Sequence, residues 1–151
     1  MPYQLAQINI AKMKYPIDDD RMKDFVDNLD LVNANADQAD GFIWRMQDES
    51  GNNTDTAEAE TEFGTNYIVN MSVWENADLL KSFMMQEPHA AIMRRKKEWF
   101  IPSGNAYMTL WWIPTGHQPT IREAALRLKS LEDNGPTQSA FHFGKIFPAP
   151  L

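Results

Sequence analysis

The sequence NYIVNMSVWENADLLKSFMMQEPHAAIMRRKKEWF, residues 66–100, contains the strongest predicted strand of the chain and the helical region after it. Its first nine residues alternate between two sets of side chains, which predicts a β-strand over residues 66–74. Asn76 or Asp78 can cap a short helix directly after this strand. Pro88 is tolerated in the first turn of a further helix, and Pro102 and Gly104 end it.

Working outward from this stretch gives the order of the elements. Strands are expected over 3–10, 41–47, 66–74 and 105–113, and helices lie between the first two and the last two. The order β-α-β-β-α-β predicts an α+β, ferredoxin-like sandwich. Thr120 and Glu123 have the spacing of a capping box, which predicts an additional C-terminal helix. We therefore expect one domain over residues 1–151, with its core in 3–113 and a helix and apolar arm in 119–151.

The alternation also assigns faces to the strands. Ile8, Val69 and Met71 suit packing against helices, so we expect the face with Gln7 and Asn9 to be free of helices. That face also carries apolar side chains, which a monomer does not usually leave exposed. We therefore expect a homodimer in which two copies meet face to face, as a dimeric α+β barrel.

Composition excludes several classes of function. The chain has 14 Lys and Arg against 21 Asp and Glu, a net charge of −7, which disfavours binding to nucleic acid. The absence of cysteine excludes disulfides and thiolate metal sites. There is no apolar run of about 18 residues to cross a membrane and no secretory signal pattern, so we expect a cytoplasmic protein.

The acidic stretch 48–65 has no periodicity and is rich in Gly, Asn, Thr and Asp. This composition predicts a long loop without an element of its own. A solvated excursion and a lid or partner-binding loop both remain open for it. We expect residues 50–62 to be the most mobile internal segment.

The chain resembles a known family. The segments LAQINIAKMKYP, VNMSVWE, RRKKEWF, LWWIPTGHQPT and GPTQSAFHF are similar to the domain-of-unknown-function 3291 family. Residues 66–100 also resemble the dimeric α+β barrel superfamily, in its antibiotic-biosynthesis-monooxygenase-like branch. The resemblance implies a dimeric barrel and leaves the activity open, because fold does not determine function.

In monooxygenase-like relatives an Asn on the first strand, a Trp at the end of the third and a His in the second helical region form the site. Asn9, Trp74 and His89 occupy similar places, which implies catalytic roles for them. An amide can hold an enolate oxygen, an indole can stack on a planar substrate, and an imidazole can move a proton. The 15-residue spacing between Trp74 and His89 is longer than in haem-degrading relatives.

Three further residues complete the candidate site. Arg45, Asn70 and Trp111 are expected to bind substrate on the same face of the sheet. Each of the six residues also has a structural alternative, such as core packing, an ion pair or a hydrogen-bonded strand position. The weakest assignment concerns the last strand, where a bulge would exchange Trp111 and Trp112.

Three functions remain open. The first is an enzyme without a bound cofactor that oxygenates, isomerises or enolises a small planar apolar metabolite. The second is a non-catalytic dimer that binds a ligand or serves a structural role. The third is a haem-binding or haem-degrading protein with His89 as the axial ligand. His89, His117 and His142 share no metal-ligand spacing, so no metal site is expected.

Overall fold

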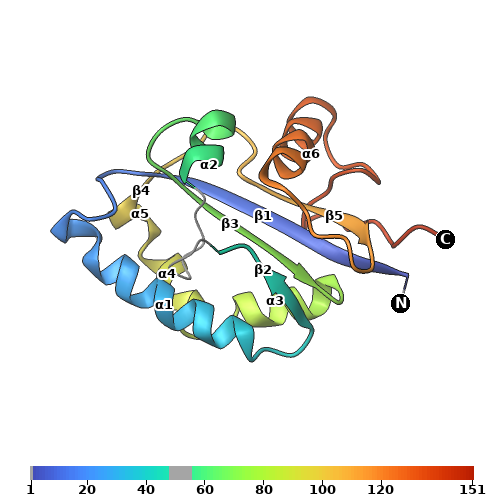
Figure 1. Ribbon diagram of the computed structural model, residues 1–151, viewed down its shortest axis with the longest axis horizontal. Helices are drawn as coiled ribbons and strands as arrows, with labels where there is room; N and C mark the ends of the chain where they lie inside the picture. The colour runs from blue at the N-terminus through green and yellow to red at the C-terminus, as the bar shows by residue number, and fades with distance from the viewer. Residues whose placement is uncertain (1, 48–55) are drawn as a thin grey trace.

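The computed structural model describes residues 2–47 and 56–151 and shows a mixed α+β fold (Figure 1). The strands are β1 (Tyr3–Met13), β2 (Phe42–Arg45), β3 (Tyr67–Trp74), β4 (Phe100–Ile101) and β5 (Met108–Pro114). The helices are α1 (Lys23–Asp37), α2 (Thr56–Phe63), α3 (Ala77–Met84), α4 (His89–Arg94), α5 (Lys96–Trp99) and α6 (Ile121–Asn134), and a 3₁₀ turn (Asp20–Met22) precedes α1. The helical region after Pro88 is thus two short helices rather than one.

The sheet is antiparallel and has β1 at its centre. Its order is β2-β3-β1, and β5 and the short β4 pair with successive parts of the far edge of β1. In the register, Asn9 lies opposite Asn70 on β3 and Leu5 lies opposite Trp74. This strand order confirms the predicted ferredoxin-like α+β fold.

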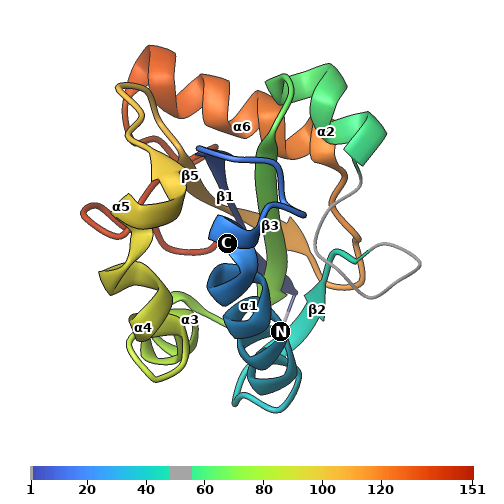
Figure 2. The ribbon, with the colours of Figure 1, turned by 90° about the vertical axis from the view of Figure 1, so that its left-hand side faces the viewer.

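Helices cover both faces of the sheet, which makes three layers (Figure 2). α1, α3, α4 and α5 pack on one face, which we call the pocket face. α2 and α6 pack on the other, which we call the dry face. The expectation of a face without helices is therefore wrong, because α6 and the unpredicted α2 supply the cover.

The predicted alternation of side chains is right, but the helices between the strands, α1 and α3 to α5, cover the opposite face from the one expected. Ile8, Val69 and Met71 lie on the dry face, whereas Gln7 and Asn9 face α1, α3 and α4. Alternation separates two sets of side chains but does not say which helices cover each set. The apolar side chains of the dry face pack against α6, whose buried residues are Ile121, Ala124, Leu128 and Leu131.

The start of α6 uses its capping residues differently from a capping box. Thr120 Oγ1 accepts a hydrogen bond from the Glu123 backbone N–H at 3.1 Å, as expected. The Glu123 carboxylate instead accepts from Trp111 Nε1 at 3.0 Å and lies 2.7 Å from His117 Nε2. Glu123 therefore ties the first turn of α6 to β5.

The acidic stretch is not loop throughout. Thr56–Phe63 forms α2, which packs beside α6 with Ala59 only 3% exposed. Arg122 of α6 forms an ion pair with Glu62 at 3.2 Å. The prediction of a stretch without an element is therefore wrong for residues 56–63, and residues 48–55 lie outside the described residues. The mobility expected for residues 50–62 stays a prediction.

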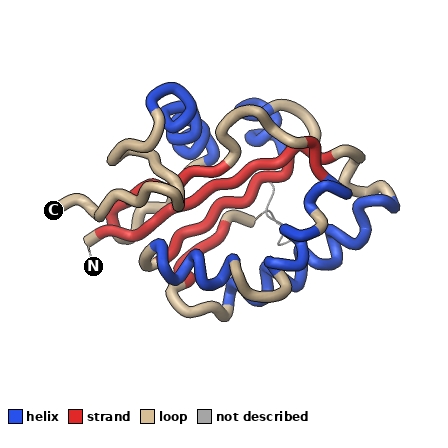
Figure 3. The backbone as a smooth tube through the Cα atoms, turned by 180° about the vertical axis from the view of Figure 1, so that it is seen from behind, coloured by secondary structure: helices blue, strands red, loops and turns tan. Residues whose placement is uncertain are grey.

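The C-terminal arm runs along the free edge of β5 (Figure 3). Leu110 and Phe141 exchange two backbone hydrogen bonds of 2.8 and 2.9 Å, and Trp112 Nε1 donates to the Phe147 carbonyl at 2.9 Å. The arm thus protects a sheet edge that would otherwise be open to pairing. No helix in the described part of the chain is both long and apolar enough to span a membrane.

Candidate functional site

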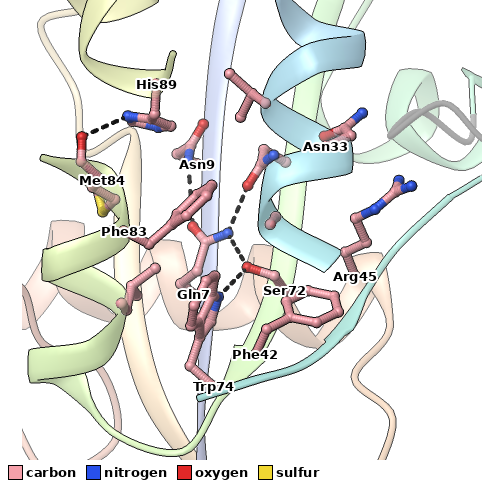
Figure 4. A pocket seen from close by; sticks show the side chains of 14 residues that line it. Gln7, Asn9, Asn33, Phe42, Arg45, Ser72, Trp74, Phe83, Met84 and His89 are labelled. Carbon is pink, nitrogen blue, oxygen red and sulfur yellow. Dashed lines mark hydrogen bonds between the residues drawn. The ribbon is translucent and has the colours of Figure 1, made fainter. Parts of the chain in front are cut away.

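A pocket lies on the pocket face, between the middle of the sheet and helices α1, α3 and α4 (Figure 4). Its volume is about 30 Å³, which is room for about two water molecules. The side chains that line it are Gln7, Asn9, Val32, Asn33, Ala36, Phe42, Arg45, Asn70, Ser72, Trp74, Leu80, Phe83, Met84 and His89. Polar side chains come mainly from the strands, and apolar ones mainly from the helices.

The floor of the pocket is a chain of hydrogen bonds between neighbouring strands. Gln7 Nε2 donates to Asn70 Oδ1 at 2.7 Å and to Ser72 Oγ at 2.8 Å. Ser72 Oγ also accepts from Trp74 Nε1 at 2.8 Å, and Asn9 Nδ2 donates to Gln7 Oε1 at 3.3 Å. Because each bond joins two side chains of the same face, the network holds the amides of the floor in fixed orientations.

Aromatic rings form one end of the pocket. Trp74 is 1% exposed, and its ring centroid lies 5.5 Å from that of Phe42 and 5.1 Å from that of Phe83. Its indole N–H already donates to Ser72 Oγ, so Trp74 can contact a ligand only through the face or edge of its ring. Trp74 therefore supports the core as well as lining the pocket.

His89 lies at the first residue of α4 and lines the pocket from the rim. Its Nδ1 is 3.0 Å from the Met84 carbonyl oxygen, which accepts only if Nδ1 carries the proton. Burial lowers the pKa of His89, and the bond to Met84 opposes this only in part. The imidazole is therefore neutral at neutral pH, with the Nε2 lone pair available as a base.

Arg45 is the cation of the pocket. Its Nε donates to Asp37 Oδ1 at 2.8 Å, and its side chain is mostly covered. It reaches the pocket because of a β-bulge between Phe42 and Trp44. The bulge places Phe42 and Arg45 together on the pocket face, whereas unbroken alternation would place two residues three positions apart on opposite faces.

The structure brings five of the six predicted site residues together. Asn9, Arg45, Asn70, Trp74 and His89 all line the pocket. Their roles in binding or catalysis stay predictions.

Trp111 is the exception. Trp112 pairs with Leu5 and Trp111 with Ala6, so Trp111 lies fully buried on the dry face. There its indole donates to Glu123, and no part of it lines the pocket. Its expected place in the site is therefore wrong, because the parity of β5 is the reverse of the one expected.

Sequence reasoning missed Asn33, a buried side chain of α1 that lines the pocket. A signal for it exists in the sequence. Asn33 lies four residues after Leu29 and three before Ala36, so it sits within the apolar stripe of its helix. A polar residue at a stripe position indicates a buried polar group that needs a partner.

The fold and the pocket define a ferredoxin-like α+β protein with a polar cavity between the sheet and its helices. The chain belongs to the family described as Domain of unknown function (DUF3291), whose model matches residues 4–151. No curated protein and no solved structure is significantly similar to it.

Proposed function

We propose that the protein is an enzyme that moves a proton on a small planar metabolite in this pocket, without a bound cofactor. The observation that carries the proposal is the state of His89. A partly buried imidazole whose Nδ1–H donates to the Met84 carbonyl presents Nε2 as a proton acceptor at neutral pH. The amides of Asn9 and Asn70 line the same pocket.

The proposed step is enolisation. Nε2 of His89 takes a proton from a carbon next to a carbonyl group, and the electron pair of the broken C–H bond moves to form the enolate. Amide N–H groups of the pocket floor then stabilise the negative oxygen, as in an oxyanion hole. Return of the proton to a different carbon gives an isomerase-like reaction, and return to the same carbon gives exchange with solvent.

The resemblance to the monooxygenase-like branch of the dimeric α+β barrels supports the same three residues. Asn9, Trp74 and His89 match the Asn, Trp and His positions of that branch and line one pocket here. The volume of about 30 Å³ admits the reacting atoms of a metabolite rather than a whole ring system. We therefore propose that the remainder of the ligand lies at the rim and that rim side chains move aside for it.

Deuterium exchange tests the proposal directly. The probe is 2-tetralone, a bicyclic ketone with acidic C–H groups, incubated in D₂O and followed by ¹H NMR. We expect the protein to accelerate exchange next to the carbonyl and the His89→Gln variant to lose that acceleration. His142→Gln is the control, since His142 lies outside the pocket and its Nδ1 accepts from the Gly144 N–H. Equal exchange in His89→Gln and in the unsubstituted protein would contradict the proposal.

A second candidate is a non-catalytic ligand-binding protein, and one observation favours it. The side-chain N–H groups of Gln7 and Trp74 are bonded to Ser72 without a ligand, and the cavity is small. Binding of 2-tetralone without any acceleration of exchange would support this candidate over the enzyme.

A haem protein is the third candidate, and the cavity volume weighs against it. The haem macrocycle is much larger than the cavity and fits only if several lining side chains are displaced. The candidate requires a Soret shift on addition of haem that is lost in His89→Gln.

We also propose, from the resemblance, a cytoplasmic homodimer. Because helices cover both faces of the sheet, the partner would contact a helix surface or the edge at β2. The exposed side chains of Leu31 and Ile43 are candidates for that contact. A molar mass of 17.4 kDa measured by light scattering, which is that of one chain, would contradict a dimer.

A further inference from the structure

Asn33 is a buried amide in the part of the pocket that α1 lines. Its side chain is 6% exposed, and it forms no hydrogen bond with any residue that the structure describes. Leaving a buried polar group without a hydrogen bond is unfavourable, so such groups are rare in folded proteins. Asn33 lines the same pocket as His89, which places the unused amide where a ligand would lie.

Two other donors in the pocket are also unused. Asn70 accepts from Gln7 through Oδ1, which leaves its Nδ2 group without a bond among the described residues. Ser72 Oγ accepts from both Gln7 and Trp74, so its own proton is not used in either bond. Strand β3 and helix α1 thus direct spare N–H and O–H groups into one small cavity.

The charge of the pocket indicates what kind of oxygen these donors suit. Among the described residues that line it, Arg45 is the only cation at neutral pH, and it is already paired with Asp37. Burial keeps His89 neutral. A bound carboxylate would have to share Arg45 with Asp37 to be neutralised, which is unfavourable in a buried site. A neutral carbonyl oxygen needs only the amide donors.

We infer that Asn33 is a positioning residue, whose amide holds the carbonyl oxygen of a neutral, enolisable ligand together with the Asn70 amide. The inference rests on the proposed function, since it names the substrate class of the same pocket. In Figure 4 Asn33 and His89 come from different helices on opposite sides of the floor. When the ligand oxygen is held on the α1 side, the carbon next to the carbonyl group lies nearer to His89, which takes its proton.

The first test compares thermal stability in the ligand-free protein. Asn33→Leu keeps the branched shape but removes the unpaired amide, so its Tm is expected to rise. Asn28→Leu is the matched control, because Asn28 is a half-buried residue of the same helix that lies outside the pocket and donates to the Asp24 carbonyl. Both substitutions change helix propensity equally. The rise must exceed that of the control, and a fall in Tm would show that Asn33 already has a partner.

The second test measures binding of two small probes with the same number of heavy atoms, acetone and acetate. In side-chain amide NMR spectra of the unsubstituted protein, acetone is expected to shift the Asn33 and Asn70 signals at lower concentration than acetate does. Asn33→Leu is expected to weaken acetone binding about two- to tenfold, the loss of one hydrogen bond. Unmoved Asn33 signals, or tighter binding of acetate, would overturn the inference.

The two proposals fail separately. If His89→Gln exchanges 2-tetralone normally while acetone still shifts Asn33, the enzyme is wrong and the oxygen site stands. If exchange depends on His89 but Asn33→Leu has an unchanged KM and kcat, the assignment of Asn33 is overturned and the enzyme stands.

Discussion

The two faces of strand β1 show how one strand serves two purposes. Ala6 and Ile8 point to the dry face and pack into an apolar core under α2 and α6. Gln7 and Asn9, one residue away, point to the pocket face and carry amides under α1, α3 and α4. Both faces are covered by helices, so burial alone does not explain the difference.

The two faces differ in whether their buried polar atoms have hydrogen-bond partners. On the dry face, polar atoms such as Trp111 Nε1 and Thr109 Oγ1 have a partner each, Glu123 and the Phe141 carbonyl. On the pocket face, Asn33 and the Nδ2 group of Asn70 have no partner within residues 2–47 and 56–151. A face built only for stability would not bury unpaired amides, because each one is unfavourable. We therefore regard the dry face as structural and the pocket face as functional.

The largest effect is expected from Trp111→Ala on the dry face. It removes a fully buried ring and leaves the Glu123 carboxylate without its indole partner, so it should lower the free energy of unfolding by about 3–5 kcal/mol. Denaturant unfolding measures this. A loss below about 1 kcal/mol would show that Trp111 is not part of a packed core.

Asn9→Leu should act mainly on catalysis. Asn9 is only partly buried, and removal of one oxyanion donor lowers kcat by about 10²–10³-fold in enzymes of this kind. The rate of 2-tetralone exchange is the readout, with unfolding measured alongside. A large loss of stability at unchanged exchange would reverse the roles assigned to the two faces.

A matched pair of hydroxyl deletions sharpens the comparison. Ser72→Ala leaves Gln7 Nε2 and Trp74 Nε1 each short of an acceptor and should lower the free energy of unfolding by about 1–3 kcal/mol. Thr109→Val removes one donated bond to the Phe141 carbonyl and should lower it by about 0.5–1.5 kcal/mol. Equal losses in the two variants would mean that the Ser72 network is no more demanding than a single bond.

The pH dependence follows from the lowered pKa of His89. In the proposed reaction the neutral imidazole is the base, so kcat/KM should fall only at a pH below the ordinary His pKa of about 6.5. For stability, the unfolded chain takes up this proton more readily than the folded one. The stability contribution of His89 is therefore complete above the unfolded pKa and is lost as the pH falls toward the folded pKa. His89→Gln should remove this part of the pH dependence, and an unchanged profile would show that another group titrates.

The smallest effect is expected from Arg122→Ala, which breaks the ion pair with Glu62 between α6 and α2. The Arg122 side chain is largely exposed, so the free energy of unfolding should fall by about 0–1 kcal/mol. A larger loss would indicate that the docking of α2 depends on this pair.

Sequence periodicity was sufficient for β1, α1 and β3, because their alternating or helical patterns are long and regular. It was insufficient for β2, where a bulge places Phe42 on the same face as Arg45, and for β5, where successive tryptophans suit either face. It also missed α2, whose stabilising contacts are with α6, far along the chain. Asn9, Asn70 and Trp74 were nevertheless placed together correctly, since parity on β1 and β3 is fixed by their own patterns, and Arg45 and His89 line the same pocket from β2 and α4. Asn33 required knowledge of which helix covers which face.

Mapping 2-tetralone by NMR chemical shifts tests the central claim, that the pocket face is the functional one, most directly. We predict that the signals of Asn9, Asn33, Asn70 and His89 shift on titration, while the Trp111 indole N–H on the dry face stays in place. Shifts centred on Trp111, or on the groove between Tyr107 and His142 at the C-terminal arm, with an unchanged pocket, would contradict the account.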